Sequence, residues 1–429
     1  MPVGRVKTNK KKIINDPVYG FIKISFEGLF DLIEHSYFQR LRRIKQLGLT
    51  YFVYPGATHT RFQHALGSFH LMGMAIQVLR SKGVEITTDE EEAALSAILL
   101  HDIGHGPFSH ALEESIVPGI HHEALSLLFM HALNKEFKGR LDTAIQIFTG
   151  QYPKQFLHQL ITGQLDMDRL DYLKRDSFFT GVTEGVIGSD RIVRMLNVVN
   201  DQLVVDHKGI YSIEKFLIAR RLMYWQVYLH KAVLSSEMLL LKLLQRARKL
   251  AGEGVELFCT PSLRHFLYRT VSRNEFFGGE KGGKNPELSE TVIGNLEKYA
   301  GLDDNDIMAS AKVWADHPDH VLSTLCKKLK NRDLSRIEIR TEPFPDEYIK
   351  AIRQSVRQNY GLQDEDIGYL VHADTISNYA YSSEDEQIQI LYHDGTLRDI
   401  TTASDMLDLA VLSKTVRKYF LYYPKDVLV

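Results

Sequence analysis

The stretch that most constrains the fold is residues 97–110, which read AILLHDIGHGPFSH. Its apolar run, AILL, predicts the wall of a buried helix, and this wall carries the ionisable pair His101 and Asp102 inward. Burying two ionisable groups costs free energy unless they are paired or bind a metal ion. We interpret the pair as a metal site.

A second His-Asp pair, His393 and Asp394, lies in a different context. Gly395 follows it within LYHDGTLRD, and Asp-Gly between alternating apolar residues is typical of a hairpin turn. One His-Asp dipeptide is weak evidence, because a chain with 18 histidines should contain on the order of one by chance. The second pair is interpreted as structural, and the first is judged by the motifs around it.

Those motifs occur in a fixed order along the chain. They are PGATHTRFQHALG (55–67), HDIGHGPFSH (101–110), HHE (121–123) and DRLDYLKRD (168–176). With these strings the chain resembles the HD-domain metal-dependent phosphohydrolase superfamily, and within it the deoxynucleoside triphosphate triphosphohydrolases. The resemblance covers roughly residues 12–235 and fades beyond them.

The spacing of apolar residues predicts a mainly α protein. Residues 12–24 predict a small hairpin, and helical periodicity follows over 30–47, 59–79 and 211–251, with an acidic first turn at 89–92 for the helix that leads to His101. Short alternating segments at 336–340, 368–374 and 387–392 predict strands. We expect an HD-domain helical core over residues 1–255, a peripheral helical region with a flexible Gly-rich loop (276–286) over 256–330, and a small C-terminal α/β lobe over 331–429.

Bulk composition describes an ordinary soluble protein. The 429 residues carry a net charge of -2, so the strong basic excess of a dedicated nucleic-acid binder is missing and nucleic acid is an unsupported partner. Cys259 and Cys326 lie far apart without CxxC spacing, which suits a reducing compartment. No signal peptide and no apolar run of about 18 residues is visible, so we expect a cytoplasmic protein without a membrane partner.

The resemblance implies one divalent transition metal, Fe, Mn, Ni, Co or Zn, with Mg²⁺ as a further candidate on the substrate phosphates. Its four ligands would be His64, His101, Asp102 and Asp168. Two imidazoles and two carboxylates make a nitrogen and oxygen donor set that suits such ions. Taken singly, His64 could be a hydrogen-bonded core histidine, Asp102 a helix-end carboxylate and Asp168 a surface charge.

Proton transfer near the metal is assigned to three residues. His105 lies four residues after His101 and so on the same helix face, and His122 and Glu123 follow in HHE. By resemblance, His105 and His122 contact phosphate and transfer protons to the leaving oxygen. His121 is interpreted as a solvated residue at a helix start.

The implied substrate is a deoxynucleoside triphosphate, hydrolysed to deoxynucleoside and inorganic triphosphate. Arginine forks suit bidentate phosphate binding. By resemblance, the phosphates are held by Arg61, His110, Arg169 and Arg220, and the sugar and base by Gln46, Leu47, Tyr172, Asp176, Tyr224 and Tyr228. Tyr224 and Leu229 depart from the residues of the resembled mammalian enzyme, which leaves the base preference open.

A second nucleotide site and self-association are also implied. Asn15, Glu34, Gln39 and Arg42 match the positions at which an activating nucleotide binds, with Glu34 in place of an aspartate. Family members work as dimers or tetramers, so we expect a homo-oligomer. Residues 407–423, LDLAVLSKTVRKYFLYY, are too apolar to stay bare on a monomer, and they would dock either on a second subunit or on the chain's own core.

Two other functions use the same motifs. An HD-domain phosphodiesterase or nucleotide phosphatase would share the metal ligands but need no triphosphate clamp, against which Arg61, Arg220, Tyr172 and Asp176 argue. A nucleotide-sensing regulator would carry a vestigial site, against which the four intact ligands argue.

Overall fold

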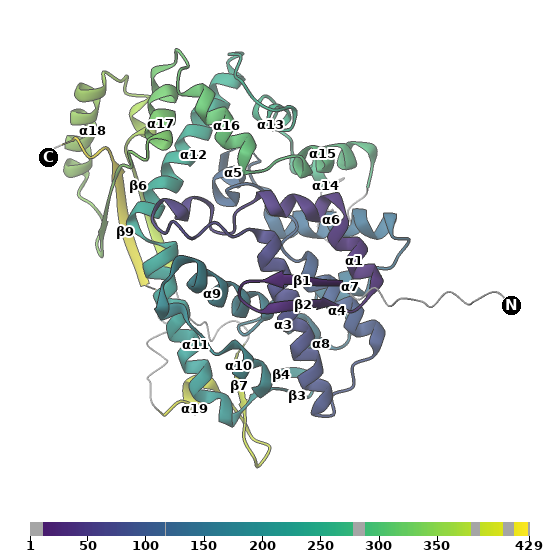
Figure 1. Ribbon diagram of the computed structural model, residues 1–429. Coiled ribbons are helices and arrows are strands. Elements are labelled where there is room, and N and C mark those ends of the chain that lie inside the picture. The colour runs from purple at the N-terminus through teal and green to yellow at the C-terminus, as the bar shows by residue number, and fades with distance from the viewer. Residues whose placement is uncertain (1–11, 116, 278–287, 379–386, 406–415, 428–429) are drawn as a thin grey trace.

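The computed structural model describes residues 12–115, 117–277, 288–378, 387–405 and 416–427. Helices make up most of the fold, and small sheets lie at its edges (Figure 1). The mainly α class with an N-terminal hairpin and C-terminal strands is confirmed. None of the described helices has the length and apolar character that a bilayer crossing requires.

Three helices form the centre of the molecule: α3 (Arg61–Ser81), α4 (Thr88–Leu100) and α9 (Met167–Thr180). Helix α3 packs against both of the others. Thr87 and Glu90 form a capping box that satisfies free amides at the start of α4. Residues 97–100 are fully buried or nearly so, which confirms the predicted apolar wall. This wall ends at His101 and so delivers it to the interior.

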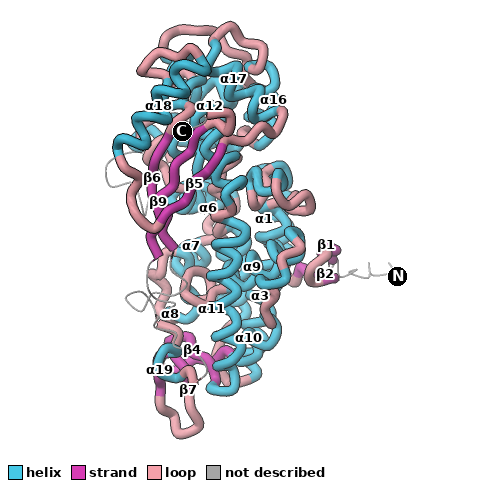
Figure 2. Tube along the Cα trace, turned by 90° about the vertical axis from the view of Figure 1, so that its left-hand side faces the viewer, coloured by secondary structure: helices cyan, strands magenta, loops and turns pink. Residues whose placement is uncertain are grey.

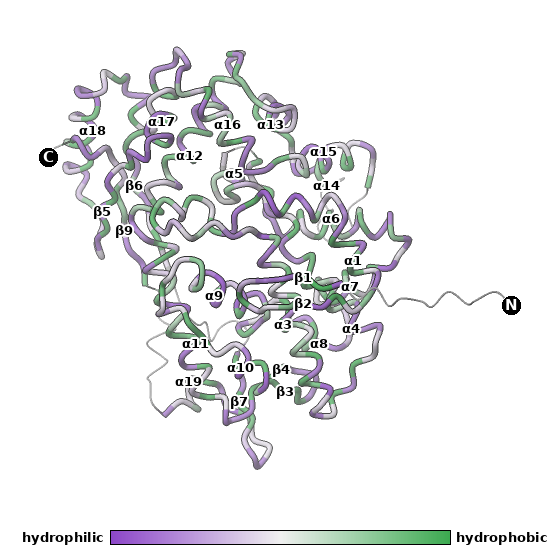
Figure 3. The backbone as a smooth tube through the Cα atoms, viewed as in Figure 1, coloured by the Kyte–Doolittle hydropathy of each residue, from purple (hydrophilic) through white to green (hydrophobic). Residues whose placement is uncertain are grey.

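Further helices surround this centre. In chain order, the helices up to residue 252 are α1 (Glu27–Glu34), α2 (Ser36–Gln39), α5 (Ser109–Ser115), α6 (His122–Glu136), α7 (Asp142–Phe148), α8 (Gln155–Gln159), α10 (Ser189–Met195), α11 (Ile210–Met223) and α12 (Lys231–Gly252). They are followed by α13 (Pro261–Leu267), α14 (Arg273–Phe277), α15 (Glu290–Ala300), α16 (Asp304–Trp314), α17 (His320–Lys330), α18 (Asp346–Tyr360) and α19 (Ile400–Ala403). Hydrophilic residues dominate α18, whose buried residues are Ile352 and Val356 (Figure 3).

The helix predicted over residues 30–47 is wrong in its extent. Helix α1 ends at Glu34, because His35 adopts extended dihedrals and its ring accepts a hydrogen bond from Tyr37 N, which starts α2. Residues 44–47 run beside 59–61, with Arg61 N donating to Ile44 O and Gln46 N to His59 O. Tertiary pairing therefore overrides the helical spacing here.

The helical run predicted over residues 211–251 is interrupted. Helix α11 passes into a π turn at Tyr224–Tyr228, and α12 begins only at Lys231 after a break at Leu229 and His230. Single π turns widen a helix locally and often mark functional positions. Here the turn carries two tyrosines of the predicted sugar and base site.

The described strands form sheets of two, four and three strands. The N-terminal hairpin pairs β1 (Lys12–Asp16) with β2 (Gly20–Ile24), as predicted. The four-stranded sheet has the order β3 (Leu196–Val199), β4 (Gln202–Asp206), β7 (Gln389–Leu391) and β8 (Leu397–Asp399), with β4 and β7 parallel. The three-stranded sheet has the order β5 (Arg336–Arg340), β9 (Val416–Tyr423) and β6 (His372–Asn378).

These sheets refine the expectation of a C-terminal lobe. The strand at 336–340 is confirmed, the one predicted at 368–374 begins at His372, and the one predicted at 387–392 is limited to Gln389–Leu391. Strands β7 and β8 extend the sheet begun by residues 196–206, while β5, β6 and β9 lie together at the opposite end of the molecule (Figure 2). The domain division at residues 255 and 330 stays a prediction.

The second His-Asp pair lies in a turn, as predicted. Strands β7 and β8 are antiparallel, and Asp394 Oδ1 accepts hydrogen bonds from Thr396 N and Oγ1 between them. Gly395 has a φ of +81°, a conformation that glycine adopts without steric cost.

The apolar segment at residues 407–423 is described from Val416 onward. Its last part is β9, the central strand of the three-stranded sheet, and Phe420 to Tyr423 are buried. Phe420 and Tyr422 pack with Leu234 of α12 and Ile337 of β5. The described part thus docks on the chain's own fold, and self-association stays a prediction. Residues 406–415 and residues 278–286 of the predicted Gly-rich loop lie outside the described residues, and the loop's first two residues, Phe276 and Phe277, end helix α14.

Candidate metal centre and active site

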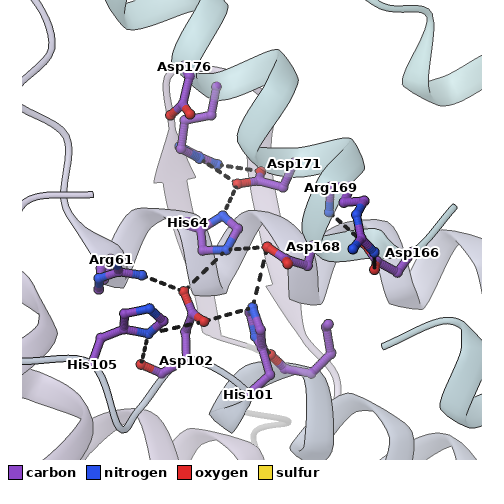
Figure 4. Close-up of polar contacts among 12 residues, drawn as sticks. Arg61, His64, His101, Asp102, His105, Asp166, Asp168, Arg169, Asp171 and Asp176 are labelled. Carbon is purple, nitrogen blue, oxygen red and sulfur yellow. Dashed lines mark hydrogen bonds and ion pairs between the residues drawn. The ribbon is translucent and has the colours of Figure 1, made fainter. Parts of the chain in front are cut away.

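Three core helices deliver the predicted metal ligands to one point. His64 comes from α3, His101 and Asp102 follow the end of α4, and Asp168 comes from the first turn of α9 (Figure 4). The ligand atoms of His64, His101 and Asp168 all lie within 4.8 Å of one another. Asp102 lies beside them, with its carboxylate oxygens 3.7 Å from His64 Nε2 and 3.5 Å from His101 Nε2.

The free nitrogen atoms at this point fit a metal ion. His64 Nε2 and His101 Nε2 are buried, and both face the carboxylate of Asp168, whose Oδ1 lies 3.0 Å from the first nitrogen and 3.6 Å from the second. Their other ring nitrogens are occupied, because His64 Nδ1 lies 2.7 Å from Asp171 Oδ2 and His101 Nδ1 lies 2.6 Å from Ile98 O. Such bonds orient an imidazole and set its tautomer so that Nε2 is left for a metal. The donor set fits a divalent transition metal.

The charges of the predicted ligands favour the binding of a cation. Burial opposes the charged form of His64, but its contacts with Asp168 and Asp171 outweigh burial and raise the pKa of His64 to about 10. Burial would likewise raise the pKa of Asp168, but the two histidines hold it well below its usual range. The carboxylates therefore attract a proton onto His64, and a bound metal ion would take the place of that positive charge.

A buried network of ion pairs holds Nδ1 of His64, the ring nitrogen that is not available to the predicted metal. Asp171 accepts hydrogen bonds from Arg175 Nε at 2.9 Å and from its terminal nitrogen at 3.1 Å, and Arg175 also bonds Asp16 of the hairpin at 2.8 Å. A Cβ at Gly67 would collide with the Asp171 carboxylate, so the glycine of RFQHALG is what allows α9 to approach α3 here. The network ties the hairpin to the metal centre.

We predict that Asp171→Asn weakens metal binding by about 10- to 100-fold, the usual loss when the partner of a metal-binding histidine is changed. The amide keeps the shape of the carboxylate but removes the charge that orients the protonated Nδ1 of His64. Metal affinity measured by competition with a chromophoric chelator checks this. Unchanged affinity would show that Asp171 only fills space. Asp190→Asn, at an exposed carboxylate, is the control.

Asp102 is shared between a cation and a histidine. Arg61 donates to Asp102 Oδ2 at 2.7 Å, and His105 Nδ1 lies 3.2 Å from Asp102 Oδ1. Burial and the Arg61 guanidinium lower the pKa of His105 to about 3. His105 is therefore neutral at neutral pH in this arrangement.

The ring of His122 stacks on that of His105, with ring centroids 3.8 Å apart. A carboxylate that sequence reasoning missed, Glu113, lies 3.2 Å from His122 Nδ1. A Cβ at Gly104 would collide with the backbone at His122 and Ser126, so this glycine lets the start of α6 reach the site. His105 and His122 are thus brought together as predicted.

For two other predicted residues the described structure gives no contact with the site. Glu123 is exposed in the first turn of α6, and within the described part of the chain it has no hydrogen bond or ion pair. The side chain of His110 lies outside the described part of α5. His121 is exposed, which agrees with its interpretation as a solvated helix-start residue.

The predicted sugar residues form a second cluster. Tyr228 donates from its hydroxyl to Asp176 Oδ2 at 2.7 Å, and His59 Nε2 lies 2.7 Å from Asp176 Oδ1. Tyr228 also packs edge-to-face with Tyr172 and Tyr224. Sequence reasoning missed His59, although it lies in the PGATHTRFQHALG string.

The predicted phosphate arginines differ in their partners. Arg169 is bound to Asp166 (Figure 4) and to Gly163 O, and Arg220 donates to Gln164 Oε1 at 3.2 Å. Arg61 Nε and Arg220 Nε are buried without a hydrogen bond to any described residue, and thus keep a donor for a ligand.

A cavity of about 440 Å³ opens beside these residues. Its walls include the site residues Arg61, Gln46, Leu47, Tyr224 and Tyr228. Gln46 Oε1 is buried and has no hydrogen-bond partner among the described residues, which leaves an acceptor for a ligand. The volume falls in the usual range for small-molecule sites.

The residues predicted for a second nucleotide site lie near the hairpin and α2. Gln39 donates to Ile33 O at 2.8 Å and accepts from Arg42 Nε at 2.8 Å, and Arg42 lies over the Phe62 ring. Asn15 and Glu34 are exposed. The structure thus joins Gln39 with Arg42, and the second site stays a prediction.

Comparison with known proteins assigns this site to a family. The sequence matches the HD domain over residues 61–176 and the HD associated region over residues 187–253. The uncharacterized protein YwfO of Bacillus subtilis is 32% identical over 438 residues, with 98% of this chain and 94% of that protein covered. A phosphohydrolase crystal structure from Bacteroides thetaiotaomicron is 53% identical with a TM-score of 0.90, covering 96% of this chain and 100% of that one. This chain belongs to the HD-domain phosphohydrolases.

Other relatives of this HD-domain phosphohydrolase have named activities. The human deoxynucleoside triphosphate triphosphohydrolase SAMHD1 is 27% identical over 382 residues, covering 79% of this chain and 56% of the human protein. The Dictyostelium discoideum homologue is 33% identical over 248 residues, covering 53% of this chain and 48% of that protein. The chain thus matches about half the length of these two relatives.

Proposed function

We propose that this HD-domain phosphohydrolase hydrolyses deoxynucleoside triphosphates to deoxynucleoside and inorganic triphosphate, by attack of water on the α-phosphorus. The observation that carries the proposal is the link between the predicted metal ligands and a 440 Å³ cavity. Arg61 lines the cavity and donates to Asp102, which lies beside His64 and His101. A phosphate monoester would need neither the size nor the tyrosines. The relatives named as deoxynucleoside triphosphate triphosphohydrolases support the same substrate class.

Each part of the nucleotide has residues that suit it. Arg61 and Arg220, with their spare Nε donors, bind phosphate oxygens. Tyr228 and Tyr172 pack against the deoxyribose, and Asp176 holds the Tyr228 hydroxyl in place. A tyrosine wall under the sugar would disfavour a 2′-hydroxyl and so favour deoxynucleotides over ribonucleotides. Gln46 offers its free Oε1 to the sugar or base.

His64, His101, Asp102 and Asp168 would hold one divalent metal ion, with Fe, Mn, Ni, Co and Zn as candidates. Such an ion supplies Lewis acidity at a phosphoryl oxygen and lowers the pKa of a water molecule so that it can attack phosphorus. Breaking the bond from the α-phosphorus to the sugar 5′ oxygen leaves an alkoxide, which must receive a proton. His122 is our candidate donor, because Glu113 holds its Nδ1 and leaves Nε2 for the substrate. His105, held neutral, contacts phosphate beside it.

The reaction products test this proposal directly. We expect metal-loaded protein incubated with each dNTP to release deoxynucleoside and triphosphate in equal amounts, because water attacks at the α-phosphorus. Anion-exchange chromatography separates triphosphate from pyrophosphate and phosphate. Release of deoxynucleoside monophosphate with pyrophosphate would refute the triphosphohydrolase, and release of phosphate from a monophosphate alone would indicate a nucleotide phosphatase.

A further inference from the structure

The loop between α4 and α5 carries His105, and its backbone takes hydrogen bonds from distant parts of the chain. Residues 101–107 are buried. Carbonyl groups at and beyond a helix end lack intrahelical partners, and a buried carbonyl without a donor costs free energy. Three consecutive carbonyls of this loop accept hydrogen bonds from residues far away in the sequence, and they belong to Ile103, Gly104 and His105.

Arg40 supplies the donors for two of these carbonyls. It begins a short 3-10 turn (Arg40–Arg43), and its guanidinium donates to Ile103 O at 3.1 Å and to His105 O at 2.9 and 2.8 Å. Tyr299 of α15 donates to the carbonyl between them, Gly104 O, at 3.0 Å. A guanidinium suits this task because its planar donors have a fixed spacing. One side chain thus holds the backbone on both sides of Gly104.

The charge of Arg40 is used differently from that of other buried arginines. Arg175 and Arg246 each pair with two carboxylates. Arg40 is 1% exposed, and within the described part of the chain it forms no ion pair; the ring centroids of Phe129 and Tyr299 lie 5.4 and 5.5 Å from its guanidinium carbon. Burial lowers the pKa of Arg40 to about 10, which leaves it charged at neutral pH. This costly buried charge is committed to the backbone of the loop.

The place of the His105 ring depends on that backbone. His105 Nδ1 lies 3.2 Å from Asp102 Oδ1 (Figure 4), and its ring stacks on that of His122 with centroids 3.8 Å apart. Both contacts require a fixed Cα position, and two of the three hydrogen bonds from Arg40 end on the carbonyl of His105 itself. We propose that Arg40 is a positioning residue, which holds the His105 ring in the active site. The proposal rests on the proposed function, in which His105 contacts phosphate.

Steady-state kinetics of Arg40→Met tests the positioning role, because methionine keeps an unbranched apolar stem but donates no hydrogen bond. We expect kcat for dNTP hydrolysis to fall about 10- to 100-fold, since a displacement on the order of 1 Å in an active site can cost about a hundredfold. KM should change little, because Arg40 lies outside the described walls of the cavity. Arg40→Lys keeps a cation that can still donate to a carbonyl, so it should lose less kcat than Arg40→Met.

Arg246→Met is the control for stability. Arg246 is also buried, and its loss leaves Asp319 and Asp366 without their cation, so the free energy of unfolding should fall while kcat stays at the wild-type value. Hydrogen exchange of the amides at residues 103–105, measured without substrate, gives a second comparison. It should accelerate in Arg40→Met, recover in part in Arg40→Lys and stay at the wild-type rate in Arg246→Met.

Wild-type kcat in a folded Arg40→Met protein would overturn the proposal, and so would unchanged exchange at residues 103–105. An equal loss of kcat in Arg40→Met and Arg246→Met would also overturn it, since stability would then explain the loss. Should the wild-type protein hydrolyse no dNTP, the proposed function fails. The exchange rates then decide whether Arg40 holds the loop, because they need no substrate.

Discussion

Replacing His101 and Asp102 by alanine should empty the metal centre and abolish triphosphate release. His101 Nε2 is a buried nitrogen without a hydrogen-bond partner among the described residues, and it is one of the three ligand atoms that lie within 4.8 Å of one another. Losing these two groups removes both affinity for the ion and the positive charge that stabilises the developing phosphoryl negative charge. Since a metal ion supplies several kcal/mol of such stabilisation, we expect kcat to fall on the order of a thousandfold or more.

Elemental analysis of the purified variant, beside anion-exchange analysis of products, measures both effects. The double change at His393 and Asp394 is the matched control, because the same dipeptide lies there in a hairpin turn far from the site, and it should keep full metal content. Wild-type metal content in the His101→Ala, Asp102→Ala protein would disprove the centre. Thermal unfolding of each variant separates loss of metal from loss of fold.

Replacing Arg175 by leucine should destabilise the protein by about 3–5 kcal/mol, the usual cost of leaving buried charges without their partner. Arg175 is fully buried and bonds both Asp171 and Asp16, so its loss removes the guanidinium from two buried carboxylates and leaves Asp171 with His64 as its charged partner. Denaturant unfolding followed by circular dichroism measures the change in the free energy of unfolding. Arg264→Leu, at an exposed pair with Glu256, should leave stability nearly unchanged. An Arg175→Leu protein as stable as wild type would contradict the account.

The loss of folding free energy in Arg175→Leu should also depend on pH. Burial would raise the pKa of Asp171, but Arg175 and His64 outweigh it and lower this pKa. A carboxyl group whose pKa is lowered on folding stabilises the protein above its unfolded pKa of about 4, and this contribution disappears as the pH falls through the folded value. The difference between wild type and Arg175→Leu is therefore largest near neutral pH and shrinks on acidification.

Local features of the fold could be predicted because their causes are local. The apolar residues before His101 predict a buried helix whatever they pack against, and the structure buries them. The Asp-Gly sequence at 394–395 predicts a turn because glycine readily adopts the positive φ that the turn requires. The ligands His64, His101 and Asp168 were found because their flanking strings resemble one family, although 104 positions separate the first from the last along the sequence. The helix interruption at His35 was missed although its cap, the His35 ring accepting from Tyr37 N, is local, and the one at Leu229 was missed because it follows a π turn that apolar spacing does not indicate.

The sequence by itself determined that the chain is mainly α, which motifs carry the metal chemistry, and that the second His-Asp pair is a turn. Periodicity, capping and turn residues act over a few positions and can be read without the fold. Only the tertiary structure decided that Arg175 links the hairpin to Asp171, the partner of His64, and that Glu113 holds His122. These contacts join residues far apart in the chain, and whether a charge finds a partner or stays buried alone depends on the packing of helices that no local pattern encodes.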